Sequence, residues 1–294
     1  MSLSTATPSA EALARKPRDD EIDVFGLTHQ GKVRKTNNDH FLIASLHKRM
    51  DVVLTSLPGL AQSSRQEERV AFFGMIADGV GGSETGEEAS RITLDTATDY
   101  LATSLQAYYG ADDREGTLER ALQEAAMRSH ASVLKRAHER ADARKRATTL
   151  TLFVGVWPWS YLLQVGDSRY YIYRDGELTQ ISRDQTYAQD LVDAGALTRA
   201  QAMGSRLKNV LSSAIGGDQT APVVTRLGSD WRNVHLFCSD GLTKHVSDER
   251  IRERIATMTS AKQLCEDLLQ EALDGGGTDN ITIIAGRTAM KDSP

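Results

Sequence analysis

The chain has 294 residues, of which 40% are hydrophobic and 26% are charged, and its formal net charge is −5. This is an ordinary globular composition, long enough for one large domain or two average ones. The negative charge gives no reason to expect a nucleic acid partner. No apolar run reaches roughly 18 residues, so no membrane insertion is expected. Two cysteines, Cys238 and Cys265, are too few for a disulfide framework, which favours a reducing cytoplasm.

The first 20 residues are rich in Ser, Thr, Pro, Ala and charged side chains, which predicts a flexible N-terminal tail rather than a secretory signal. Residues 21–288 are expected to form one domain, and residues 289–294 a C-terminal tail. Two strand-like runs, 21–31 and 39–47, open this domain. Residues 48–68 contain Pro58 and Gly59 and are expected to form a long loop.

The apolar run "RVAFFGMIAD" then predicts a strand that is buried on both faces. Helical spacing of apolar residues predicts two helices, at about 84–109 and 117–146. The remaining expected elements are strands at 148–157, 160–168 and 169–178, a polar helix-like excursion from Asp184 to Ser205, strands at 221–228 and 233–241, helices at 247–258 and 260–276, and a last strand at 279–287. This order favours an α+β fold with helix pairs on mainly antiparallel sheets over a regular βαβ alternation.

Five aspartates stand at the ends of predicted strands: Asp39, Asp78, Asp167, Asp240 and Asp279. Carboxylates gathered in this way repel one another unless a cation lies between them. No His or Cys accompanies them at ligand spacing, which disfavours zinc, whereas ligation by oxygen alone suits Mg²⁺ or Mn²⁺. A single Asp-Gly pair is most simply a turn, but the repetition at strand ends favours a metal site.

The glycines after Asp78 have two possible purposes. They permit a tight turn in which the Gly79 carbonyl can approach an ion closely. The competing interpretation, a phosphate-binding loop, fails on spacing, because Glu87 follows Gly86 where a P-loop requires Lys. Arg34 lies five residues before Asp39 in the expected first turn. Alone it is most simply a solvated residue, but beside two metal ions its guanidinium could clamp a phosphate dianion.

Eight short motifs follow one another in register from about Glu21 to Arg287: "NND", "DGVGG", "TTL", "VGDSR", "RDGEL", "NVLSSAIGG", "SDGL" and "TDNIT". In these motifs the chain resembles the type 2C metal-dependent Ser/Thr protein phosphatases (the PPM family) in their bacterial form. The resemblance implies a four-layer α-β-β-α sandwich with the metals in a cleft at one end. It also implies hydrolysis of phosphoserine and phosphothreonine in proteins, which reverses Ser/Thr kinase signalling. The expected partners are a Ser/Thr kinase and its substrates, and the protein is expected to be a monomer.

The resemblance also implies residue roles. Asp78 bridges two Mn²⁺ or Mg²⁺ ions, and the Gly79 carbonyl serves the second of them. Asp240 and Asp279 hold the first ion, and Asp39 acts from the outer shell through metal-bound water.

A third, weaker ion would bind at Asp167. Arg34 and Asp78 are the expected catalytic residues, Arg34 by clamping the phosphate while a metal-bridging water attacks phosphorus in line. The segment from Asp184 to Ser205 would be a mobile flap beside the cleft.

One departure concerns the metal centre, since Asn38 stands where bacterial members usually carry glutamate, and its loss removes a negative group near the second ion. Three functions therefore stay open. An active phosphoprotein phosphatase is favoured because all five clustered acids are kept. The alternatives are a catalytically weak or inactive regulator that binds phosphoproteins, and a hydrolase of non-protein phosphate esters.

Overall fold

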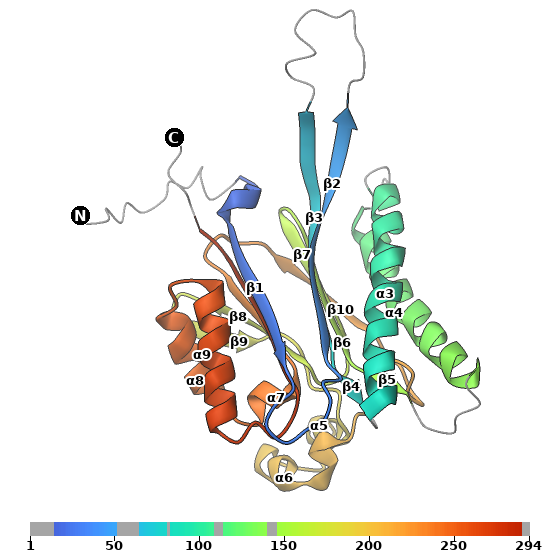
Figure 1. Cartoon of the computed structure of the whole chain (residues 1–294), viewed down its shortest axis with the longest axis vertical. Coiled ribbons are helices and arrows are strands. Elements are labelled where there is room, and N and C mark those ends of the chain that lie inside the picture. Colours follow the sequence, from blue (N-terminus) through green and yellow to red (C-terminus); the bar gives the residue numbers. More distant parts are fainter. Residues whose placement is uncertain (1–14, 52–64, 81–82, 109–113, 140–145, 290–294) are drawn as a thin grey trace, which may run out of the picture.

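The computed structural model describes residues 15–51, 65–80, 83–108, 114–139 and 146–289. These residues form two five-stranded sheets that lie face to face (Figure 1). The first sheet has the order β1 (Ile22–His29), β12 (Ile281–Thr288), β11 (Val234–Cys238), β8 (Arg169–Arg174), β9 (Glu177–Gln180). The second has the order β10 (Val223–Gly228), β7 (Trp159–Val165), β6 (Leu150–Val156), β3 (Arg65–Ala77), β2 (His40–Asp51). All these neighbours pair antiparallel, as the element order predicted.

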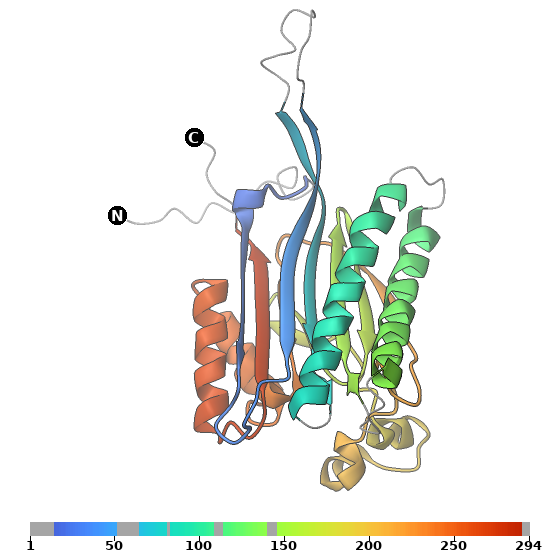
Figure 2. The same cartoon turned by 45° about the vertical axis from the view of Figure 1, so that its right-hand side comes forward.

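Helix pairs cover the outer faces of both sheets (Figure 2). The helices α3 (Ser83–Tyr108) and α4 (Arg114–Glu139) lie on the second sheet, while α8 (Asp248–Ala256) and α9 (Ala261–Asp274) lie on the first. This confirms the expected four-layer α-β-β-α sandwich. No helix within the described ranges has the length and apolar character needed to cross a membrane.

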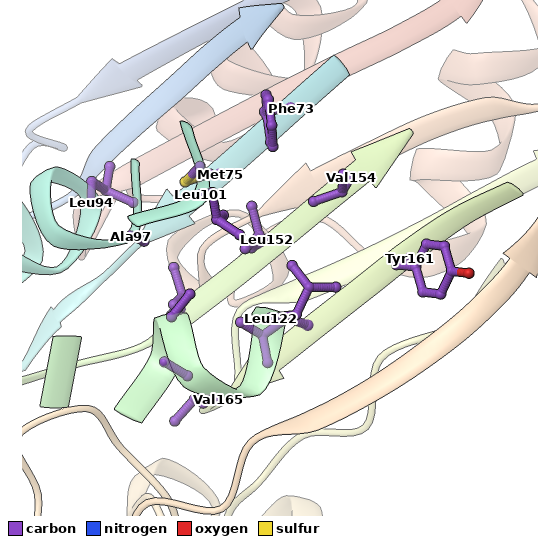
Figure 3. Packing of buried hydrophobic residues seen from close by; sticks show 14 of the residues in the cluster. Phe73, Met75, Leu94, Ala97, Leu101, Leu122, Leu152, Val154, Tyr161 and Val165 are labelled. Atoms are coloured by element: carbon purple, nitrogen blue, oxygen red, sulfur yellow. The ribbon is translucent and has the colours of Figure 1, made fainter. Parts of the chain in front are cut away.

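Strand β3 shows why its sequence is so apolar. Phe73 and Met75 face the helices and pack with Leu101 and Leu152, as Figure 3 shows. Ile76 points the other way, into the layer between the two sheets. Because both faces of the strand are covered, apolar side chains are needed at successive positions, and the prediction of a doubly buried strand is confirmed.

The predicted loop over residues 48–68 is wrong at both ends. Strand β2 continues to Asp51 and strand β3 begins at Arg65, and these two residues are register partners in a long hairpin. This part of the hairpin projects beyond the sandwich (Figure 1), and Lys48 and Glu68 are exposed. A strand pair that is surrounded by solvent does not need alternating apolar residues. Its sequence therefore lacks the pattern from which strands are predicted. Residues 52–64 lie outside the described residues.

The boundaries at other elements differ less. The second predicted helix ends at Glu139, and residues 140–145 lie outside the described ones. Residues 15–21 contact the domain: the Trp231 indole donates to the Arg15 carbonyl at 2.8 Å, and Arg69 donates to the Pro17 carbonyl at 2.6 Å. The predicted tails are outside the described chain at residues 1–14 and 290–294.

One end of the sandwich collects the turns that carry the aspartates. The loop between β1 and β2, the start of α3 and the one-turn helix α7 (Asp240–Thr243) all lie there, opposite the projecting hairpin (Figure 1). The small sheet of β4 (Gly79–Val80) and β5 (Ala147–Thr148) closes this end. The predicted excursion from Asp184 to Ser205 lies beside it and contains two helices, α5 (Tyr187–Asp193) and α6 (Arg199–Gly204).

Candidate active site

Strand register brings the five aspartates to the same end of the molecule. In the second sheet His40 pairs with Ala77, so Asp39 and Asp78 adjoin a paired position on neighbouring strands. In the first sheet Cys238 pairs with both Ile283 and Arg169. The residues just outside these three strand ends are Asp240, Asp279 and Asp167. Antiparallel pairing therefore gathers carboxylates that are up to 240 positions apart in the sequence.

The backbone of Asp78 is fixed by the segment that follows α4. Its N–H donates to Thr149 Oγ1 at 3.0 Å, and its carbonyl accepts from Thr149 N at 2.9 Å and from Thr148 Oγ1 at 2.8 Å. The sequence identified "TTL" as a motif but did not predict these hydrogen bonds to the backbone of Asp78. These hydrogen bonds satisfy the N–H and the carbonyl of Asp78 and fix the position of its side chain at the strand end.

Burial raises the pKa of Asp78 well above its ordinary value, and the charges of Asp39, Asp240, Asp167 and Asp279 raise it further. A carboxyl group that feels four like charges is strained in the ionised state unless a cation is present. This mutual repulsion is the clearest electrostatic feature of the site.

Gly79 follows Asp78 where no larger residue fits. A Cβ at this position would lie 2.3 Å from the Gly86 carbonyl oxygen and 2.7 Å from the Asn38 carbonyl oxygen. Three backbone segments therefore meet here: the end of β3, the first turn of α3 and the residues before β2. Gly79 and Gly86 permit this close approach of backbones because neither has a side chain.

Asp39 is buried and only half satisfied. Its Oδ2 accepts a hydrogen bond from Thr282 Oγ1 at 2.8 Å, whereas its buried Oδ1 has no hydrogen-bond partner. Burial raises the pKa of Asp39 to about 6, and the hydrogen bond from Thr282 opposes this shift. An orphaned buried carboxylate oxygen is a group that a water or a cation can satisfy.

Two cations face the cluster from the described part of the chain. Arg34 lies in the loop after β1, and its Nε is 2.6 Å from Asp279 Oδ1. Lys244 follows α7, and its Nζ is 2.6 Å from both Asp240 Oδ2 and Asp279 Oδ2. Burial raises the pKa of Asp279, but the hydrogen bonds from Arg34 and Lys244 outweigh this effect and hold it below its ordinary value.

Sequence reasoning found Arg34 and missed Lys244. The available signal was its spacing of four residues from Asp240, which places the two side chains on one face of a helix. Residues 233–241 were predicted to form a strand that includes Asp240, and the four-residue spacing brings side chains together only in a helix. In the structure the strand ends at Cys238, and Asp240 begins the helical turn of α7.

Asp167 lies in the turn between β7 and β8, next to the base of the flap. Burial raises its pKa to about 7, Asp240 and Asp184 add to the shift, and Lys244 opposes it. Gly166 before it adopts φ +100°, and its N–H and carbonyl both bond to Gln185. The segment from Asp184 onward is thus tied directly to the turn that carries Asp167.

Asn280 is a second residue that the sequence did not reveal. Its Oδ1 accepts from Asn38 N at 2.9 Å, and its Nδ2 donates to the carbonyls of Gln30 at 2.9 Å and Thr36 at 2.8 Å. It therefore fixes both ends of the loop that carries Arg34. This role depends on contacts between residues more than 240 positions apart, which no local pattern predicts.

The donor set fits an oxygen-ligated divalent cation. It consists of carboxylates, a close-packed glycine carbonyl and the orphaned oxygen of Asp39, without His or Cys. Within residues that the structure describes, no three His, Cys, Asp or Glu side chains already form a ready-made cluster for one ion. The positions of Arg34 and Lys244 explain this, because they hold Asp279 and Asp240 by ion pairs.

Two hollows lie within the described part of the structure. A depression of about 620 Å³ is lined by Lys35, Thr36 and Asn37 and by Glu84, Glu87 and Arg91 of α3. A cavity of about 120 Å³ lies between the sheets, and is lined mainly by apolar groups. None of the five aspartates lines either hollow, but the residues that line the first belong to the loop of Arg34 and to α3, which follows Asp78.

The cysteines take no part in the site. Cys238 and Cys265 are both buried, and burial raises the pKa of each thiol to about 12. Neither is a nucleophile at neutral pH.

Two solved structures of a bacterial phosphatase have this architecture. The crystal structure of the Mycobacterium tuberculosis serine/threonine phosphatase PstP/Ppp superposes with a TM-score of 0.73 at 28% identity, over 92% of this chain and 99% of that chain. The catalytic domain of PstP in complex with two manganese ions superposes with a TM-score of 0.70, also at 28% identity, over 92% of this chain and 99% of that one.

The sequence comparisons lead to the family. A family model described as protein phosphatase 2C matches residues 61–275. The serine/threonine protein phosphatase PstP of M. tuberculosis H37Rv is 33% identical over 209 residues, which are 71% of this chain and 39% of that protein. The serine/threonine phosphatase Stp of Listeria monocytogenes EGD-e is 26% identical over 211 residues, 71% of this chain and 82% of that protein.

This chain belongs to the protein phosphatase 2C family. It spans well under half the length of PstP.

Proposed function

We propose that the chain is a divalent-metal-dependent phosphatase of phosphoserine and phosphothreonine in proteins. The observation that carries the proposal is the convergence of five aspartates at the strand ends on one end of the sandwich, where burial and the charges of the other four raise the pKa of Asp78. A cluster of this kind is stable in its ionised form only with cations in it. Its oxygen donors suit Mn²⁺ or Mg²⁺, and PstP, a relative, has been solved with two manganese ions.

In this proposal Asp78 would serve both ions and the Gly79 carbonyl the second, while Asp240 and Asp279 would serve the first. Asp39 would act from the outer shell through water with its unpartnered Oδ1. When bound, such ions supply positive charge to a phosphate and lower the pKa of water, which generates the nucleophile. The glycine-lined approach of three backbones at Gly79 keeps that side of the site free of side chains.

Arg34 is the proposed phosphate clamp. Its guanidinium already points at the cluster, where it bonds Asp279, and its side chain is 52% exposed, so a substrate can reach it. A guanidinium offers two parallel donors to phosphate oxygens, which both orients the group and stabilises the charge that develops on it. Asn280 positions this residue by holding the loop on which it lies.

Asp167 is the proposed ligand of a third ion. The positive charge of Lys244, which opposes the raised pKa of Asp167, lies close enough to weaken binding there. The polar depression between the Arg34 loop and α3 is the proposed place of the polypeptide around the phosphorylated residue. The flap, residues 184–205, adjoins Asp167 through Gln185 and would contact the substrate from the other side.

The proposed substrates are proteins that a Ser/Thr kinase phosphorylates, in the cytoplasm, where two free buried thiols are stable. We propose a monomer, because every residue assigned to the site comes from one chain.

The test is phosphate release from a phosphothreonine peptide and from p-nitrophenyl phosphate with Mn²⁺. A protein phosphatase should show the higher kcat/KM on the peptide. Preference for the small ester would point to a non-protein substrate, and binding of the peptide without turnover would indicate an inactive regulator.

A further inference from the structure

Lys244 joins two carboxylates of the cluster. Its Nζ lies 2.6 Å from Asp240 Oδ2 and 2.6 Å from Asp279 Oδ2. Asp240 and Lys244 are four residues apart around the single turn of α7, so one helical turn points both side chains the same way. Asp279 comes from the residue pair that precedes β12, the neighbour of β11 in the sheet.

The ammonium group is held rather than solvated. The side chains of Lys244, Asp240 and Asp279 keep only 29%, 24% and 17% of their surface exposed. Ion pairs at this depth are screened less than surface pairs. Without the charge of Lys244 the two aspartates would repel one another more strongly, since the nearby Arg34 is already bonded to Asp279.

A divalent ion would need the same place. Mn²⁺ or Mg²⁺ binds carboxylate oxygens at roughly 2.0–2.2 Å, so an ion shared by Asp240 and Asp279 would lie between the oxygens that now receive the ammonium. Two cations cannot occupy one gap between two carboxylates, and their like charges repel.

We propose that Lys244 is an internal counter-ion that occupies the gap between Asp240 and Asp279 in the metal-free protein and competes there with the divalent ion. This inference rests on the proposed function, which assigns both aspartates to one ion.

Two consequences distinguish a competitor from a residue that helps to bind the metal. A competitor lowers the affinity for the ion, because the ammonium must leave before the ion can bind. It also stabilises the metal-free fold, because it neutralises carboxylates that otherwise repel. A residue that helps the metal to bind would have the opposite effect on affinity.

The experiment is calorimetric titration of the whole chain with MnCl₂ alone, together with thermal melting in EDTA. The variants are Lys244→Met, which keeps the length and removes the charge, Lys244→Gln, and Lys244→Arg, which keeps the charge. Lys262→Met is the matched control, since Lys262 lies on α9 at 63% exposure with its Nζ 3.8 Å from Glu266. Melting with saturating Mn²⁺ shows that each variant is folded.

For Lys244→Met and Lys244→Gln we expect Mn²⁺ to bind more tightly, on the order of tenfold, because an opposing charge is removed. We also expect a lower melting temperature in EDTA, whereas Lys244→Arg and Lys262→Met should resemble the wild type in both measurements. Equal or weaker Mn²⁺ binding by both neutral variants would overturn the inference alone. A wild-type protein that binds no Mn²⁺ would overturn the proposed function and the inference together.

Discussion

Arg34 and Asp279 are 245 positions apart in the sequence, and the Arg34 Nε lies 2.6 Å from Asp279 Oδ1. The pair joins the loop after the first strand to the turn before the last strand. These strands are neighbours in the first sheet, with His29 opposite Ile281. The pairing thus places a cation, the proposed phosphate clamp, at the edge of a carboxylate cluster, and it makes Arg34 the first residue to test.

We expect Arg34→Ala to raise KM for a phosphothreonine peptide by roughly tenfold or more, since a bidentate charged contact to phosphate is lost. The kcat value should fall less, because the proposed metal ligands remain. Steady-state kinetics with Mn²⁺ measure both. Arg128→Ala is the control, since Arg128 pairs with Glu124 on the exposed face of α4. An unchanged KM would remove Arg34 from the substrate site.

Removing the hydrogen bonds that hold the Arg34 loop should weaken substrate binding in the same way as removing Arg34. Asn280→Ala removes three hydrogen bonds to Asn38, Gln30 and Thr36 and leaves the N–H of the buried Asn38 without its partner. This should cost about 1–3 kcal/mol of stability and raise KM in the manner of Arg34→Ala. Denaturant unfolding and steady-state kinetics check the two effects separately. A stable variant with normal KM would show that the loop holds its position by other contacts.

Gly79 provides a test of the backbone arrangement. In Gly79→Ala the new Cβ would meet the carbonyl oxygens of Gly86 and Asn38, at 2.3 and 2.7 Å before any relaxation. We expect a loss of about 1–3 kcal/mol and weaker Mn²⁺ binding, because backbone rather than a flexible side chain must move. Gly228→Ala is the matched control, since nothing lies within 4 Å of its Cβ position. Equal unfolding curves for the two variants would contradict the account of Gly79.

The buried aspartates predict how pH acts on the metal-free protein. Burial, together with neighbouring charges, raises the pKa of Asp167 to about 7 from its ordinary value of 3.8. Between these two values the folded state keeps a proton that the unfolded state has lost. The unfavourable contribution of Asp167 to stability is therefore absent below about pH 4, grows as the pH rises, and is complete above about pH 7.

Asp167→Asn isolates this contribution, since the amide is neutral at every pH. In EDTA the variant should melt close to the wild type at pH 4 and above it at pH 8. A difference between Asp167→Asn and wild type that is the same at both pH values would contradict the raised pKa.

Much of this site could be predicted from the sequence, because the residues next to each aspartate in the chain indicate its position. Each of Asp78, Asp240 and Asp279 adjoins an apolar strand and a glycine or turn, so its place at a strand end can be read directly. The convergence of those ends depends on strand register, which the family resemblance implied and composition did not. Lys244 and Asn280 were missed because their partners depend on a helical turn and on contacts across the whole chain.

The fold shows the same limit. Strand β3 was predicted because both its faces are buried, whereas its extension from Arg65 was not, because that part has no core to face. The spacing of apolar side chains indicates which residues are buried. It therefore predicts secondary structure only where one or both faces of an element are covered.

The most direct test of the central claim is phosphate release from a phosphothreonine peptide by wild type and Asp78→Asn, each with Mn²⁺ and with EDTA. The account predicts turnover only for wild type with Mn²⁺, and a loss on the order of 10²–10³-fold or more in Asp78→Asn. Asp78→Asn should also melt no lower than wild type in EDTA, because it removes a repelled carboxylate. Turnover by wild type in EDTA, or by Asp78→Asn at the wild-type rate, would contradict a metal centre built on Asp78.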